Sequence, residues 1–286
     1  MSDAAAGHLP ISFAIVGVQK AATSTMHTML VRHRHVARGT AKELHFFDDE
    51  RLDWVDPDYS HYVVPRTKEK QRVAGDATPS YIWWPQALER MHRYNSDMRL
   101  IASFRDPIER AFSQWSMERK RRHSYPSFGE SIEKFGDLTL LDEFPPGHTS
   151  RDVRRLMVVR GLYGEQLRRG LSVYDRSQWL MVAFRRFVRE PEVVLDEIAE
   201  HLGIGAWNRH PPLRANPTPR DQVGPAPTAA DMERLVDVYA DDLTLFARLS
   251  GLDVTDWPTS RIAAGSLAPA DLAAELARKV GLEVEE

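Results

Sequence analysis

The sequence of 286 residues contains no cysteine, which excludes disulfides, thiolate catalysis and cysteine-based zinc sites. It also has no apolar run of about 18 residues, the length that a membrane-spanning helix needs. The first ten residues, MSDAAAGHLP, combine neither a basic segment nor an apolar one, so we expect no signal peptide. These absences predict a cytoplasmic protein without a membrane partner.

The sequence also lacks a large excess of positive or negative charge. Its formal net charge is −3, and 28% of the residues are charged against 42% that are apolar. Such a balance gives no general attraction to nucleic acid, so no nucleic-acid partner is expected and any anion site has to be built locally. The composition is that of a globular protein with a substantial core. It leaves the oligomeric state open, a homo-oligomer included.

What the sequence does contain is an alternation of apolar and amphipathic segments. Ile11–Gly17 is mostly apolar and ends in glycine, which is typical of a central parallel strand, and helical spacing begins near Thr23 or Ser24. Further strands are expected at the beginning of Glu43–Asp49, in Arg72–Tyr81 with a break at Gly75, in Arg99–Pro107 and in Gln178–Phe184. Further helices are expected over Ile108–Arg122, Asp152–Arg169, Pro191–Gly203, Ala229–Ser250 and Pro269–Gly281. This order predicts an α/β fold with a mostly parallel sheet, and Arg119–Thr149 between its elements is expected to form a cap over the site.

The loop after the first strand has the composition of an anion site. A strand–loop–helix unit directs backbone N–H groups at whatever lies above the helix N-terminus, where the helix dipole favours an anion. Lys20 adds a positive charge, and three hydroxyl donors follow at Thr23, Ser24 and Thr25.

The spacing of this loop differs from the Walker pattern, G-x-x-x-x-G-K-[ST]. Lys20 comes three residues after Gly17, and no glycine precedes the hydroxyls. No aspartate that could hold magnesium ends a strand, so we expect a phosphate-like group bound without a metal. The alternative is a helix N-cap made by Thr23 or Ser24, with Lys20 solvated.

A second anion site is expected around Arg105. Arg105 ends a predicted strand, at the edge where parallel sheets bind ligands, and its guanidinium suits a phosphate. Ser113 follows eight residues later, across the start of a helix. The alternative is that Arg105 forms a structural ion pair with Asp106 or Glu109. Two separate anion sites predict a ligand with two anionic ends.

Seven stretches carry a family resemblance: IVGVQKAATSTMHTML, AKELHFFDDE, GDATPSYIWWP, LIASFRDPIERAFSQW, YPSFGESI, RGLYGEQLRRGL and LFARLSGLDVTDW. Together they resemble the sulfotransferases that use 3′-phosphoadenosine 5′-phosphosulfate (PAPS), closest to the heparan-sulfate-type branch and its bacterial relatives. The resemblance implies a single domain over about residues 11–257, with a P-loop-like parallel sheet of about five strands flanked by helices. Residues 1–10 remain as a flexible N-terminus and residues 258–286 as a C-terminal helical extension.

The resemblance also implies roles for individual residues. The 5′-phosphosulfate of PAPS is expected on Lys20, Ala21, Ala22, Thr23, Ser24 and Thr25. Arg105 and Ser113 match the pair that binds the 3′-phosphate, while the family's late basic loop has only Arg220 as a candidate. Glu43 matches the catalytic base, and His45 and Asp48 match residues near the acceptor.

One departure from the family bears on the acceptor. The heparan-sulfate enzymes have a lysine that touches an acidic sugar where this chain has Asp76, before ATPSY. We therefore expect a small metabolite, a natural product of secondary metabolism or a sugar in place of a polysaccharide. Tyr81 and the pair Trp83–Trp84 are interpreted either as a wall of the acceptor site or as core packing.

The identity of the base is left open between two residues. If the segment is a strand, Glu43 and His45 face the same side, and burial beside Phe46 and Phe47 would raise the pKa of Glu43. His45 is the rival because the pKa of a free histidine lies near neutrality. The structural alternatives are that Glu43 pairs with Lys42 or Lys20, and that His45 is a hydrogen-bonded core histidine.

Two other functions remain as hypotheses. The chain could be a P-loop-type phosphotransferase, a kinase that uses ATP and magnesium, or a non-catalytic relative that binds an anion. The basic run Arg119–His123 is interpreted as the solvated end of a helix in preference to a surface that steers anions. The extension after Trp257 is expected to cover the sheet edge, pair subunits or bind a partner.

Overall fold

The computed structural model of the chain describes residues 7–39, 41–122, 124–136, 156–212 and 222–283. It divides into two compact units. The first, here called the sheet unit, comprises the described residues up to Phe104 and those from 169 to 212. The second, the helical unit, comprises the described residues 105–136, 156–168 and 222–283. Arg220, His123 and residues 137–149 of the expected cap over Arg119–Thr149 lie outside the described residues.

The sheet unit is built on five parallel strands in the order β2-β4-β1-β5-β6. Their bounds are β2 Val36–Ala37, β4 Val73–Asp76, β1 Gly7–Gly17, β5 Arg99–Phe104 and β6 Trp179–Ala183. β1 is central, as its apolar composition predicted. The first residues of β1 pair antiparallel with a sixth strand, β3 (Val63–Arg66). Residues 7–10, predicted to be a flexible terminus, are therefore part of the sheet.

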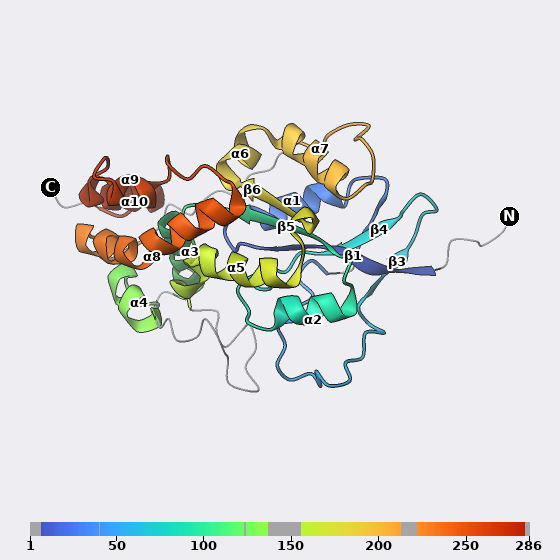
Figure 1. Ribbon diagram of the computed structural model, residues 1–286. Helices are drawn as coiled ribbons and strands as arrows, with labels where there is room; N and C mark the ends of the chain where they lie inside the picture. Colours follow the sequence, from blue (N-terminus) through green and yellow to red (C-terminus); the bar gives the residue numbers. More distant parts are fainter. Residues whose placement is uncertain (1–6, 40, 123, 137–155, 213–221, 284–286) are drawn as a thin grey trace. The chain divides into compact units, whose positions relative to one another are not determined.

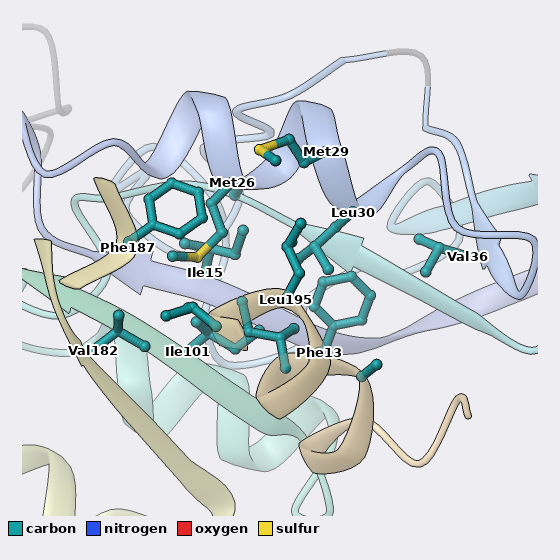
Figure 2. Packing of buried hydrophobic residues seen from close by; sticks show 14 of the residues in the cluster. Phe13, Ile15, Met26, Met29, Leu30, Val36, Ile101, Val182, Phe187 and Leu195 are labelled. Carbon is teal, nitrogen blue, oxygen red and sulfur yellow. The ribbon is translucent and has the colours of Figure 1, made fainter. Parts of the chain in front are cut away.

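Helices cover both faces of this sheet (Figure 1). One face carries α1 (Thr23–Leu30), α6 (Phe184–Arg189) and α7 (Pro191–His201), and the other carries α2 (Ala87–Tyr94). Figure 2 shows the core beneath the first group, in which the side chains of β1 that point to this face pack against α1 and α7. Phe13 and Ile15 alternate with residues that face the other way, because side chains of a strand repeat every second residue. Burial of each such side chain contributes about 1.5–3 kcal/mol.

The helical unit contains most of the remaining helices. They are α3 (Pro107–Arg121), α4 (Phe128–Phe135), α8 (Ala229–Ser250), α9 (Pro258–Ala263) and α10 (Pro269–Val280). α8 has the predicted bounds because its ends are encoded locally: Thr228 and Asp231 form a capping box, and Gly251 ends the helix at a φ of 72°. α10 packs against α8 and α3. α5 (Tyr163–Val173) begins in the helical unit and ends in the sheet unit.

Three predictions of local structure are wrong. Glu43–Asp49 contains no strand, and His45 has a left-handed backbone with a φ of 51°. The helix expected from Asp152 begins at Tyr163, after a 3₁₀ turn. β4 does not break at Gly75 but continues to Asp76. Gly75 serves packing: a Cβ atom there would lie 2.2 Å from the ring of Phe13. Among the described residues, no helix is long and apolar enough to cross a membrane.

We predict that Gly75→Ala lowers the free energy of unfolding by about 1–3 kcal/mol, because the added methyl group overpacks the core at Phe13. Urea unfolding followed by circular dichroism measures the change. Gly7→Ala is the matched control, since a Cβ atom at Gly7 meets no heavy atom within 4 Å. Equal stability of the two variants would contradict the packing role of Gly75.

Candidate active site

The loop between β1 and α1 has an unusual backbone. Lys20 and Ala22 both have left-handed conformations, with φ values of 72° and 63°. Residues other than glycine rarely adopt this backbone conformation, and each such residue costs on the order of 1–3 kcal/mol. The loop is held by two backbone hydrogen bonds: Val18 N donates to Ser103 O at 2.8 Å, and Ala21 N donates to Val18 O at 3.2 Å.

This backbone favours an anion at the start of α1. The N-cap residue is Ala22, whose side chain makes no capping hydrogen bond, so the alternative of a cap made by Thr23 or Ser24 is wrong. The first N–H groups of a helix have no partner within the helix, and a left-handed residue next to a helical one directs neighbouring N–H groups to one side. Lys20, Ser24 and Thr25 are partly exposed around this turn. The loop therefore has the donors and the charge that a phosphate or sulfate group requires.

A chain of ionisable groups lies in the loop that follows β2. His45 Nδ1 is 2.9 Å from Asp48 Oδ2, and His45 Nε2 is 3.6 Å from Glu43 Oε2. The second carboxylate oxygen of Glu43 pairs with the Nζ atom of Lys42. Asp48 is buried with 0% of its side chain exposed, whereas Glu43 and His45 are 41% and 40% exposed. His45 thus connects a buried carboxylate to one that solvent reaches.

These contacts set the charges of the chain. The ion pair with His45 outweighs burial and, together with Lys42, lowers the pKa of Glu43 to about 2. Burial alone would lower the pKa of His45, but the hydrogen bond to Asp48 and the ion pair with Glu43 outweigh it and raise this pKa to about 9. The prediction that burial beside Phe46 and Phe47 raises the pKa of Glu43 is therefore wrong. At neutral pH an imidazolium lies between two carboxylates.

Asp76, which has no exposed surface, fixes the loop that carries Glu43 and His45. Asp76 accepts hydrogen bonds from Leu44 N at 3.3 Å, Thr78 Oγ1 at 2.8 Å, Tyr62 OH at 3.0 Å and Tyr81 OH at 2.7 Å. Burial raises the pKa of this carboxyl in spite of these donors. Tyr81 is buried as well. The structure gives Asp76 and Tyr81 a role in holding the loop, and does not support the predicted contact of either side chain with the acceptor.

The aromatic residues near this loop belong to the core. Phe47, Trp83 and Trp84 are 0%, 2% and 0% exposed, so core packing is the correct one of the two interpretations for the tryptophans. Phe46 is half-buried, and its ring lies 5.0 Å from that of Tyr62. Its backbone N–H donates to the hydroxyl of Tyr81 at 3.1 Å. The aromatic cluster supports the loop from one side.

The helical unit contains the second predicted anion site. Arg105 Nε lies 3.3 Å from Glu109 Oε2, so the structural ion pair considered from the sequence does form with Glu109. Asp106 instead caps α3: its carboxylate accepts hydrogen bonds from the backbone N–H groups of Glu109 at 2.9 Å and Thr259 at 2.8 Å. Ser113 is partly exposed one turn of α3 after Glu109. Glu109 and Ser113 are four residues apart on one face of α3, and Arg105 lies just before the N-cap of this helix.

The basic run at the end of α3 has structural contacts. Arg119 donates to Tyr125 O at 2.8 Å and to Val223 O at 2.5 Å, and Arg121 pairs with Glu118 at 3.2 Å. This agrees with the interpretation as a helix end. The pairing of Glu43 with Lys42, one of the alternatives considered from the sequence, does form, whereas the role of Ser80, which donates to Asp48, was missed. The signal for Ser80 was its place in the motif TPS, shortly after Asp76, and the signal for Lys42 was its place directly before Glu43.

Comparison with known proteins assigns the family. The sulfotransferase domain family matches residues 10–210. Heparan sulfate glucosamine 3-O-sulfotransferase 6 of Mus musculus is 30% identical over 193 residues, which are 66% of this chain and 51% of that protein. Heparan sulfate glucosamine 3-O-sulfotransferase 3B1 of Homo sapiens is 29% identical over 66% of this chain and 45% of that protein. The chain spans about half the length of the curated relatives it matches.

The chain belongs to the sulfotransferase domain family, a family of enzymes that transfer sulfuryl groups. The crystal structure of a sulfotransferase from Alicyclobacillus acidocaldarius has a TM-score of 0.68 and 23% identity, and covers 87% of this chain and 98% of that one. It supports the α/β fold. The family match includes the Lys20 loop, Glu43, His45, Arg105 and Ser113 but not α8, α9 or α10.

We predict that His45 titrates with a pKa of about 9 and that Asp48→Asn lowers this value, because one of its two carboxylate partners is lost. NMR titration of the ring resonances, assigned with His45→Asn, measures both. His27 is the internal comparison, since burial first and then Lys42 lower its pKa to about 4. A near-neutral pKa for His45 in the wild type would contradict the ion chain.

The same groups predict how stability depends on pH. The folded pKa of His45 is raised, so its contribution is complete below pH 6.5 and is lost as the pH rises toward about 9. The folded pKa of Glu43 is lowered, so its contribution is present above pH 4.5 and is lost as the pH falls toward about 2. His45→Asn should remove the alkaline loss, as urea unfolding between pH 6 and pH 10 would measure.

Proposed function

We propose that the protein transfers a sulfuryl group from PAPS to a hydroxyl group of a small metabolite, natural product or sugar. The observation that carries the proposal is the loop at Lys20 in a chain of the sulfotransferase domain family. Its two left-handed residues lead directly into a helix that has no side-chain cap. PAPS, typical of this family, supplies the activated sulfuryl group.

In this proposal the Lys20 loop holds the 5′-phosphosulfate end of the donor. The loop N–H groups and the hydroxyls of Thr23, Ser24 and Thr25 are donors for its oxygens. The ammonium group of Lys20 stabilises the negative charge that the leaving phosphate gains. Arg105 and Ser113 of the helical unit are proposed for the 3′-phosphate. For Arg105, binding a phosphate competes with its ion pair to Glu109.

The pKa values favour Glu43 over His45 as the proton acceptor. A base has to be unprotonated at the working pH, and with a pKa of about 9 His45 carries its proton at neutrality. Glu43 is ionised, and its low pKa makes it a weak base while His45 and Lys42 both contact it. An acceptor hydroxyl that displaces Lys42 from the exposed carboxylate would raise the basicity of Glu43. His45, held by Asp48, then keeps that carboxylate oriented.

The proposed acceptor is smaller than a polysaccharide. The relatives named above act on heparan sulfate glucosamine, and in such enzymes a lysine that contacts the acidic sugar is expected where this chain has Asp76. Here that position is a buried carboxylate whose donors are all internal. This supports an acceptor without the charge of heparan sulfate. A cytoplasmic location and a place in secondary metabolism belong to the same proposal.

We predict that adenosine 3′,5′-bisphosphate raises the melting temperature in the presence of EDTA, because the proposed donors are protein groups alone. Lys20→Ala should weaken bisphosphate binding and lower the sulfation rate about a hundredfold or more. Lys70→Ala, on an exposed lysine of the same unit, is the control. Stabilisation by ATP and magnesium only would instead identify a phosphotransferase.

We predict that Glu43→Gln lowers kcat for transfer of labelled sulfate about a hundred- to ten-thousandfold, because the base is lost, while bisphosphate affinity is kept. An acceptor screen with the wild type provides the substrate for this assay. Glu69→Gln is the matched control on an exposed carboxylate. Full activity of Glu43→Gln together with loss of activity in His45→Asn would assign the base to His45. A wild type that binds the bisphosphate but sulfates no acceptor would favour the non-catalytic hypothesis.

A further inference from the structure

A cation from the C-terminal helix shares the carboxylate that pairs with Arg105. Lys279 Nζ lies 3.3 Å from Glu109 Oε1, while Arg105 Nε lies 3.3 Å from the other oxygen, Oε2. Lys279 stands on the last turn of α10, and its ammonium group also lies 2.6 Å from Glu275 Oε1. One side chain of α3 therefore holds two positive groups that are far apart in the sequence.

Burial makes this arrangement consequential. The side chain of Glu109 is only 6% exposed, against 18% for Arg105 and 41% for Lys279. A nearly buried carboxylate is costly unless it is paired, so Glu109 attracts any cation within reach. Its backbone N–H donates to a second carboxylate, that of Asp106, which is 3% exposed. Loss of Lys279 would leave more negative charge facing Arg105, at the place where the proposed phosphate has to bind.

The position of Lys279 is fixed by packing. Leu272, Leu276 and Val280 of α10 are each at most 1% exposed. Gln222, which precedes α8, connects the end of α10 to α3: its backbone N–H donates to Val280 O at 3.1 Å, and its Nε2 donates to Ser116 O at 3.3 Å. The ammonium group of Lys279 is therefore carried by a helix, α10, that is packed against the rest of the helical unit.

We propose that Lys279 is a positioning residue of the donor site. Its ammonium group offsets the charge of Glu109, which leaves the guanidinium of Arg105 available for a phosphate of the donor nucleotide. The inference rests on the proposed function, because it takes Arg105 to bind the 3′-phosphate. It gives the extension beyond residue 257 a role in donor binding, although that segment lies outside the family match at residues 10–210.

Isothermal titration calorimetry with the full chain tests the proposal, with two ligands that differ only in the 3′-phosphate: adenosine 3′,5′-bisphosphate and adenosine 5′-monophosphate. Lys279→Met should weaken binding of the bisphosphate about tenfold, because the charge of Glu109 is then no longer offset and competes with the phosphate for Arg105 at a partly exposed site. Binding of the monophosphate should stay unchanged. A merely structural role of Lys279 would change both affinities alike.

Two further variants serve as controls. Lys279→Arg keeps the charge and should restore bisphosphate affinity to within about twofold. Arg278→Met removes one positive charge from the neighbouring, exposed position of α10 and should leave both affinities as in the wild type. Thermal unfolding of each variant checks that the chain is folded.

The variant Glu109→Gln separates an effect through Glu109 from a direct contact. With the carboxylate neutral, Lys279→Met should lose most of its effect on bisphosphate affinity. Equal loss in both backgrounds would overturn the proposal, since Lys279 would then act on the phosphate itself. Wild-type affinity in Lys279→Met would overturn it too. If the wild type binds no bisphosphate at all, the proposed function fails and the inference fails with it. If the wild type binds the bisphosphate and Lys279→Met binds it equally well, only the inference fails.

Discussion

The loop that carries Glu43 and His45 depends on one buried carboxylate, Asp76, at the end of β4. The buried carboxylate of Asp76 accepts hydrogen bonds from the N–H group of Leu44 and from three hydroxyl groups, those of Thr78, Tyr62 and Tyr81. Because Leu44 stands between Glu43 and His45 in the chain, this hydrogen bond sets the path of the backbone that carries both groups. Removing the carboxylate would leave several buried donors without an acceptor, which costs more than any one bond contributes.

The helices could be predicted from the sequence where their ends are encoded by neighbouring residues. The capping box at Thr228 and the glycine at Gly251 gave α8 its correct bounds. β2 and β3 were not expected, because strands of two and four residues carry little periodicity and form through pairing with β4 and β1. Gly75 was interpreted as a strand break because the sequence does not show what it packs against. The structure shows that the ring of Phe13, far away in the sequence, leaves no room for a side chain at Gly75.

The composition of the candidate site was easier to predict than its electrostatics. Glu43, His45 and Asp48 were grouped from the motif, and the structure brings them together, although through a loop and not a strand. Their pKa values depend on which groups are in contact, and the contacts of His45 and then Lys42 with Glu43 reverse the pKa shift expected from burial. Lys279 carried no signal, because 170 residues separate it from Glu109.

The left-handed conformations of Lys20 and Ala22 have a consequence for the energetics of the proposed donor site. A glycine at these positions would adopt such angles freely and would also leave them freely. Alanine and lysine adopt them only under the constraint of the surrounding fold, so the unfavourable torsions are imposed when the chain folds. For the proposed anion site this means that the loop is preorganised, so that little conformational entropy would be lost when an anion binds.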